Sequence, residues 1–247
     1  MDLLIVKNDF KRNKIINFTL LLFMIFSACL AIMSIIMGVQ TYTSISDFYE
    51  QAEPPHFLQM HKGEIDQEKL NKFMSNYQGL NYWQLQTMIN IYGENLTIVG
   101  NETYDISDLR LDISLVKQNE DKDLLLDAQH NKIILNKGQI GIPVLLKNMY
   151  NMEVGDKVVL SSDGISKEFT IKEFVLDSQM NSPMTSSTRI LLSDEEFEDL
   201  KGQIGEQEYL IEAYFTDTNE ASSFQSAYES ANLPINGPAI TYGMIFL

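Results

Sequence analysis

The stretch KRNKIINFTLLLFMIFSACLAIMSIIMGV, Lys11–Val39, decides how the chain is organised. No charged residue lies between Ile15 and Val39. As an α-helix at 1.5 Å per residue, this segment would be about 37 Å long, which exceeds the roughly 30 Å hydrocarbon core of a bilayer. The pattern therefore predicts a transmembrane helix over residues 15–39.

The flanks of this segment predict its orientation. Four basic residues come shortly before it: Lys7, Lys11, Arg12 and Lys14. The first charge after it is Asp47. Basic flanks stay in the cytoplasm, so we expect the four side chains to hold residues 1–14 inside as a basic, amphipathic segment. Everything after Val39 is then extracytoplasmic, and the protein is expected in the plasma membrane.

Two alternative interpretations treat the same stretch as an export signal. A cleaved signal peptide has an apolar core of roughly 7–15 residues, and FSAC, Phe26–Cys29, is similar to a lipoprotein signal. In both cases the apolar residues Leu30–Val39 would stay attached to the exported protein. We therefore favour an uncleaved span. Beyond it, apolar residues at helical spacing predict a stalk helix over residues 40–53, which ends at Pro54.

Composition limits the class of partner. The net charge is −16, and because the first fourteen residues contribute +2, the remainder carries −18. Such a surface repels nucleic acid, so no nucleic-acid partner is predicted. The only cysteine, Cys29, lies inside the apolar run, which excludes a disulfide within the chain.

Two β-α-β patterns, one early and one late, predict an α+β domain outside the membrane. The first has strands at 56–62 and 82–92 around a helix capped by Asp66. The second has a strand at 208–215 and a helix that opens with Asp217 and Glu220. We interpret residues 54–104 and 193–234 as one ferredoxin-like βαβ domain.

Between these two parts, residues 105–192 are expected to form an inserted β-rich subdomain. Its predicted short strands are 111–116, 132–135, 157–160, 168–175 and 189–192. Ser161–Gly164 predicts a hairpin turn, and Pro143 predicts the start of a short helix. Residues 235–247 turn apolar and are interpreted either as the start of a second transmembrane helix, before which the chain would be cut, or as a buried terminal strand.

Motifs that would indicate catalysis are missing from the sequence. It contains no GxxxxGK[ST], HExxH, GxSxG or GxGxxG, so we predict neither an enzyme nor a cofactor. Asp121, Asp123 and Asp127 lack the spacing of a calcium loop and are interpreted as a solvated turn. Three histidines are expected at the surface or at strand ends, which leaves no metal site: His56, His61 and His130.

The passage VGDKVVL, Val154–Leu160, followed by Glu168–Ile171, resembles a helix, V-G-D bend and two-strand passage of the FtsX-like permease family of ABC transporters. The order of basic segment, span, stalk and βαβ domain with a β-rich insert is similar to that family too. The outer part resembles the MacB-type periplasmic core domain. Gly155 and Asp156 would make the bend that positions the insert. Glu173-Phe174 departs from the pattern, because the family often has a glycine there.

The resemblance implies a membrane permease subunit that works as a homo- or heterodimer with a separate cytoplasmic ABC ATPase. It implies contact with membrane lipid, mechanical coupling through the membrane helices, and a lipid, lipoprotein or antimicrobial peptide as substrate. An alternative stays open, namely the extracytoplasmic sensor region of a membrane receptor or histidine kinase. The sequence after Leu247 would distinguish the two.

Overall fold

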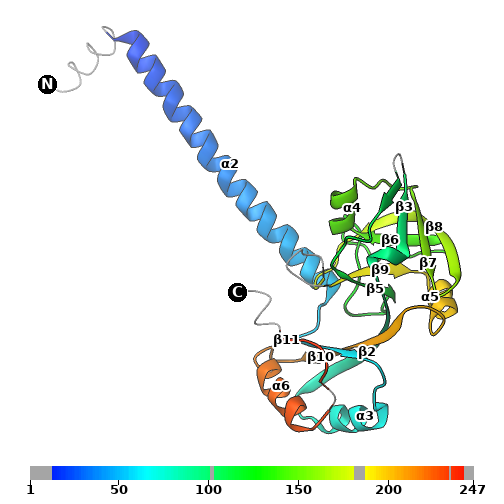
Figure 1. Cartoon of the computed structure of the whole chain (residues 1–247). Helices are drawn as coiled ribbons and strands as arrows, with labels where there is room; N and C mark the ends of the chain where they lie inside the picture. The colour runs from blue at the N-terminus through cyan, green and yellow to red at the C-terminus, as the bar shows by residue number, and fades with distance from the viewer. Residues whose placement is uncertain (1–12, 101–102, 181–186, 234, 242–247) are drawn as a thin grey trace. The chain divides into compact units, whose positions relative to one another are not determined.

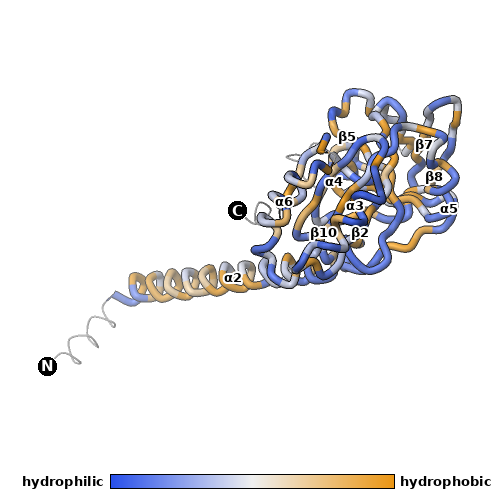
Figure 2. Tube along the Cα trace, turned by 90° about the horizontal axis from the view of Figure 1, so that it is seen from below, coloured by the Kyte–Doolittle hydropathy of each residue, from blue (hydrophilic) through white to orange (hydrophobic). Residues whose placement is uncertain are grey.

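The computed structural model describes residues 13–100, 103–180, 187–233 and 235–241. The chain divides into two units, Met1–Phe48 and Tyr49–Leu247 (Figure 1). The first unit is dominated by helix α2, Lys14–Ala52, which runs unbroken through the ranges predicted as span and stalk. Figure 2 colours most of this helix as hydrophobic, and its large apolar side chains from Ile15 to Ile45 are exposed. Among the described residues, α2 is the one helix long and apolar enough to cross a membrane.

The second unit contains one sheet of eleven described strands. The strands are β1 (Phe57–Lys62), β2 (Leu80–Ile91), β3 (Leu96–Val99), β4 (Thr103–Asp105), β5 (Asp112–Lys117), β6 (Gln139–Pro143), β7 (Lys157–Ser162), β8 (Ile165–Val175), β9 (Ser187–Leu192), β10 (Glu206–Phe215) and β11 (Ala239–Thr241). The helices are α3 (Gln67–Asn76), α4 (Val144–Tyr150), α5 (Asp194–Leu200) and α6 (Glu220–Ser230). Along the sheet, neighbouring strands follow the order β11-β1-β10-β2-β5-β9-β6-β8-β7-β3-β4.

Two β-α-β units interleave at one end of this sheet. Helix α3 joins β1 to β2, α6 joins β10 to β11, and β10 lies between β1 and β2, antiparallel to both. Both helices pack on the same face (Figure 1), where the rings of Phe57 and Phe224 meet edge to face with centroids 4.9 Å apart. Asp66 caps α3 as predicted, because its carboxylate accepts the Lys69 N–H at 2.9 Å. The predicted α+β class is confirmed.

The other end of the sheet, β5 to β4, encloses a second apolar core. Strands β3 and β4 belong here, because Ile98 pairs with Val158 of β7. The predicted boundary at residue 104 therefore differs from the strand pairing: the chain changes ends of the sheet at the 3₁₀ turn Gly93–Asn95.

Three local expectations differ from the structure. Residues 132–135 do not form a strand, and Lys132 makes only an isolated bridge with Leu126. The short strand β6 was missed, since QIGIP combines glycine and proline, which both disfavour strands. Helix α6 begins after Asn219 without a side-chain cap, because the Asp217 carboxylate accepts the Asn219 N–H instead of an N–H of the helix.

The bends predicted around Gly155 and in the hairpin are well formed. Gly155 has φ +99°, a left-handed value that favours glycine. The Asp156 carboxylate accepts the Glu153 N–H at 2.8 Å, which closes the turn before β7. In the hairpin, Asp163 and Gly164 both have positive φ, as a two-residue primed turn requires.

The last described residues, 235–241, include a short strand. Ala239–Thr241 forms β11 and pairs with β1. Residues 239–241 therefore follow the alternative of a strand. Residues 242–247 lie outside the described residues, so a second span after β11 stays a prediction.

Candidate functional site

The candidate site lies where α2 enters the second unit, at the residues we call the helix foot, Tyr49–Glu53. Ala52 is fully buried, and Glu53 leaves the helix with a left-handed backbone, φ 46°. Two backbone hydrogen bonds hold these residues: Leu124 N–H donates to the Ala52 carbonyl at 2.8 Å, and Asp123 N–H donates to the Glu53 carbonyl at 2.9 Å. The helix foot is therefore bound to the loop that follows β5.

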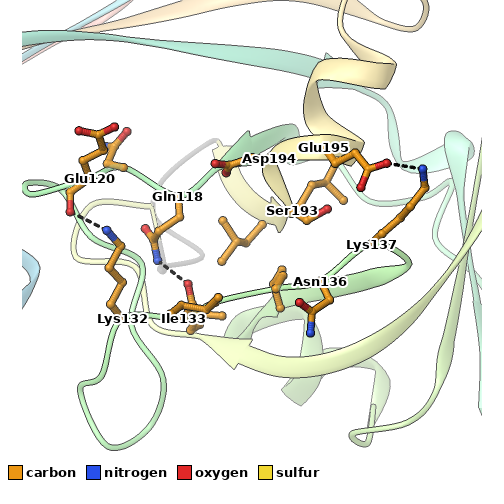
Figure 3. A pocket seen from close by; sticks show the side chains of 14 residues that line it. Gln118, Glu120, Lys132, Ile133, Asn136, Lys137, Ser193, Asp194 and Glu195 are labelled. Atoms are coloured by element: carbon orange, nitrogen blue, oxygen red, sulfur yellow. Dashed lines mark hydrogen bonds and ion pairs between the residues drawn. The ribbon is translucent and has the colours of Figure 1, made fainter.

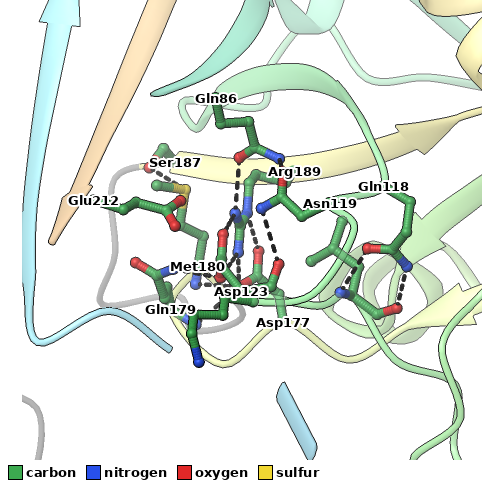
Figure 4. Close-up of polar contacts among 12 residues, drawn as sticks. Gln86, Gln118, Asn119, Asp123, Asp177, Gln179, Met180, Ser187, Arg189 and Glu212 are labelled. Atoms are coloured by element: carbon green, nitrogen blue, oxygen red, sulfur yellow. Dashed lines mark hydrogen bonds and ion pairs between the residues drawn. The ribbon is translucent and has the colours of Figure 1, made fainter. Parts of the chain in front are cut away.

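Asp123 is the centre of a buried ionic cluster (Figure 4). Its side chain is completely buried and forms an ion pair with Arg189 of β9. This corrects the prediction that Asp121, Asp123 and Asp127 form a solvated turn. Asp121 is exposed, and Asp127 accepts N–H groups of its own turn, but the loop folds across the polar face of β2 and β10 and buries Asp123 there.

Arg189 uses its guanidinium to join three segments of the unit. Nε and Nη2 each donate to the Asp177 carboxylate at 2.7 Å, which is a bidentate pair. Nη2 also donates to Asp123 at 3.0 Å, and Nη1 donates to Gln86 Oε1 at 3.1 Å. Burial opposes the charge of Arg189, but the two carboxylates outweigh burial and raise its pKa. The charged guanidinium of Arg189 therefore links β9 to β2 and to the two loops that contain Asp123 and Asp177.

Glu212 of β10 adds a third carboxyl group that has no cation of its own. Its Oε2 accepts Gln84 Nε2 at 2.6 Å and the Tyr214 hydroxyl at 2.9 Å. Its Oε1 receives no hydrogen bond from a donor among the described residues, but the Glu212 carboxyl group lies within hydrogen-bonding reach of the Asp123 carboxylate. Burial and the neighbouring Asp123 carboxylate raise the pKa of Glu212 well above its ordinary value. Burial would also raise the pKa of Asp123, but Arg189 overrides it and lowers that pKa.

A layer of aromatic and charged residues lies between this cluster and solvent. Lys122 pairs with Glu53, and its Nζ lies 5.3 Å from the centroid of the Tyr214 ring. His56 Nδ1 accepts the Phe215 N–H at 2.9 Å, and burial together with Lys122 lowers the pKa of this imidazole. These residues line a pocket of about 390 Å³ beside the helix foot.

A second pocket, of about 480 Å³, lies elsewhere on the unit (Figure 3). It is lined by residues 118–120, 132–137 and 191–195. Its two lysines already have partners: Lys137 pairs with Glu195 at 2.5 Å, and Lys132 Nζ donates to the Glu120 carbonyl at 2.5 Å. Ile134 is 81% exposed at its rim. The lining provides no nucleophile with an adjacent base, so this pocket indicates no catalytic chemistry.

The residues predicted from the sequence lie apart from this cluster in the chain. Lys14 is exposed in the first turn of α2, and Lys7, Lys11 and Arg12 lie outside the described residues. Gly155 and Asp156 serve the bend described above. Within residues 13–100, 103–180, 187–233 and 235–241, no three histidine, cysteine or acidic side chains are placed to hold a metal ion.

Sequence reasoning missed Arg189, Asp177 and Glu212. One signal was available for the first of them. Arg189 lies in STRILL, Ser187–Leu192, a strand whose residues are all buried. An arginine inside such a strand requires acidic partners, although the sequence does not say which of them lie nearby.

The solved structures similar to this chain include extracytoplasmic transporter domains. The periplasmic region of MacB from Actinobacillus actinomycetemcomitans matches with a TM-score of 0.40 and 9% identity, over 79% of this chain and 92% of that one. The extracellular domain of the noncanonic ABC-type transporter YknZ from Gram-positive bacteria matches with a TM-score of 0.38 and 7% identity, over 75% and 98%. No protein-family model matches the chain, and no curated protein matches its sequence.

Proposed function

We propose that this chain is a permease subunit of an ABC transporter in the plasma membrane, with α2 as its span and the second unit outside. The observation that carries the proposal is the continuity of α2: one 39-residue helix includes an exposed apolar segment and ends in a buried site of a folded unit. The sequence resemblance to FtsX-like permeases adds the expected partners. These are a cytoplasmic ABC ATPase, a second permease subunit, identical or different, and membrane lipid.

The apolar part of α2 is suited to lipid. Two of its hydroxyl groups are satisfied within the helix, since Thr19 donates to the Ile15 carbonyl and Ser34 to the Leu30 carbonyl, both at 2.9 Å. An unsatisfied polar group in hydrocarbon would cost several kcal/mol. Residues 15–39 contain no charge that could line an ion path, so we propose that α2 transmits movement rather than conducts ions.

The route for that movement leads through the helix foot. An unbroken helix moves as a rigid element, so a shift at its cytoplasmic end would reach Ala52 and Glu53. From there it would pass to residues 122–124 and through Arg189 into the sheet. The four lysine and arginine residues before the span would keep the N-terminus in the cytoplasm.

The finer details of fold and substrate belong to the same proposal. The β11-β1-β10-β2 part would be a ferredoxin-like βαβ domain and residues 96–192 its β-rich insert, and the return to the membrane would come after β11. We propose no enzymatic activity. The substrate class implied by the resemblance is a lipid, a lipoprotein or an antimicrobial peptide at the outer membrane face.

Co-purification tests the assignment. The full-length protein would be tagged, extracted from its native membranes in mild detergent and assayed for ATP hydrolysis and for the identity of bound subunits. We expect a separate ATP-hydrolysing subunit in a fixed ratio to the tagged chain. Recovery of a kinase module on the same polypeptide, with autophosphorylation and no separate ATPase, would support the sensor alternative and overturn the permease.

A further inference from the structure

We propose that the cluster around Glu212 is a proton-dependent latch on the outer end of α2. Neutral Glu212 holds residues 122–124 against the helix foot, and loss of its proton releases them. The latch is derived from the geometry of the second unit alone. It depends on the proposed function only for its use, which would be to let the outer conditions control how tightly helix and domain are coupled.

Residues 122–124 contact the helix foot on one side and the buried cluster on the other. On one side, the backbone of Asp123 and Leu124 binds the helix foot, and Lys122 pairs with Glu53. On the other side, the Asp123 carboxylate binds Arg189. The Tyr214 ring lies below Lys122, and its hydroxyl donates to Glu212 at 2.9 Å. Glu212 is therefore next to Asp123 and to Tyr214, whose ring lies below Lys122.

Charge counting shows why Glu212 needs its proton. Arg189 supplies one positive charge to the carboxylates of Asp123 and Asp177, which leaves the buried cluster with one net negative charge. A second uncompensated charge on Glu212 would lie beside Asp123 in a site without water contact. The raised pKa of Glu212 agrees with this geometry.

The groups that face Glu212 come from every element packed around it. They are Lys122 and Asp123 after β5, Asp177 after β8, Arg189 on β9, Tyr214 on β10, Tyr82 on β2, and His56 before β1. Burial and the nearby carboxylates raise the pKa of Tyr214, so its hydroxyl stays a donor. Only Lys122 and Arg189 supply positive charge in this set, and each is already paired.

Backbone strain explains why the latch would open at this point. Glu53 and Asp123 both have left-handed backbones, φ 46° and φ 51°, and they are hydrogen-bonded to each other. Such a conformation is strained in a non-glycine residue and persists only where the surroundings impose it. When Glu212 loses its proton to solvent, repulsion pushes Asp123 away, and both residues can relax.

Hydrogen–deuterium exchange of the full chain in detergent tests the latch. Exchange of the peptide that covers residues 120–126 would be measured from about pH 6 to about pH 10 and corrected for the intrinsic rate, which itself rises with pH. In the wild type we expect protection to fall about tenfold per pH unit between the ordinary pKa of Glu212 in the open state and its raised pKa in the closed latch, and to level off above that raised pKa. Glu212→Gln keeps the shape but has no proton to lose, so its protection should stay constant.

A matched variant and a second measurement keep the test decisive. Glu208→Gln changes another buried glutamate of β10 and should keep the wild-type pH response. Infrared spectra of the wild type should show a protonated carboxyl band that disappears at the upper end of the pH range over which residues 120–126 lose protection. Equal pH responses in the wild type and Glu212→Gln, or an ionised Glu212 at neutral pH, would overturn the latch. Neither readout depends on a bound ATPase.

Discussion

Strand β10 contains two buried glutamates four residues apart on one face of the sheet, and their surroundings differ sharply. Glu208 is 1% exposed and pairs at 2.8 Å with Lys62, whose side chain is 47% exposed. Glu212 is fully buried and has only amide and hydroxyl donors, with Asp123 nearby. A buried carboxyl group beside another carboxylate, as Glu212 is beside Asp123, keeps its proton. Burial alone therefore does not decide which glutamate responds to pH.

Removal of Arg189, the one buried arginine or lysine among the described residues, should have the largest effect. Arg189→Met leaves Asp123 and Asp177 without a counter-charge, so we expect a loss of about 3–5 kcal/mol in the free energy of unfolding. Urea unfolding of the full chain in detergent, followed by the emission of its single tryptophan, Trp83, would measure it. Arg110→Met changes an exposed arginine and should stay within about 0.5 kcal/mol of the wild type. Equal losses of unfolding free energy in Arg189→Met and Arg110→Met would show that Arg189 does not compensate buried carboxylates.

The Asp123 charge can be removed without a change of backbone preference. Asparagine tolerates a left-handed conformation, so Asp123→Asn should keep the loop while it weakens the Arg189 contact by about 1–3 kcal/mol. Without the neighbouring charge, the pKa of Glu212 should fall, although burial still holds it above the ordinary value. The infrared carboxyl band should then disappear at lower pH than in the wild type. An unchanged titration would show that Asp123 does not act on Glu212.

The comparison of the two glutamates predicts different slopes of stability against pH. The folded-state pKa of Glu212 is raised, so above its unfolded pKa only the folded state holds the proton, and stability falls by about 1.4 kcal/mol per pH unit until the folded pKa is passed. Glu212→Gln removes this decline, and Glu208→Gln keeps it. Unfolding free energies at several pH values would measure the slopes. A wild-type slope in Glu212→Gln would assign the decline to another group.

The smallest expected effect concerns the strain at the helix foot. Glu53→Ala and Glu53→Gly both lose the Lys122 pair, but only glycine adopts φ 46° without strain. We therefore expect the glycine variant to be more stable than the alanine variant by about 1 kcal/mol. Urea unfolding of the pair would show it. An alanine variant as stable as the glycine variant would mean that the foot is not held in this conformation.

Periodic patterns predicted the elements but not the cluster. The cap at Asp66 and the hairpin turn at Asp163-Gly164 depend on neighbours in the sequence, and the sequence showed both. Asp123 and Arg189 are 66 residues apart, and the alternating glutamines of β2, Gln84 and Gln86, look like a solvent-facing row. That face is covered by a loop, which no local pattern indicates. The pairing of β3 with β7 was also missed, because no local pattern in the sequence shows which distant strand a strand pairs with.

The account depends most on the placement of the second unit outside the membrane, and one labelling experiment tests this directly. Ser162→Cys puts a thiol near the hairpin turn, and the native Cys29 lies within the apolar part of α2. Intact cells would be treated with a membrane-impermeant maleimide. We expect the Ser162→Cys protein to be labelled before lysis and the parent protein, with Cys29 alone, to stay unlabelled. Labelling of Ser162→Cys only after permeabilisation would contradict the proposed topology and the coupling that depends on it.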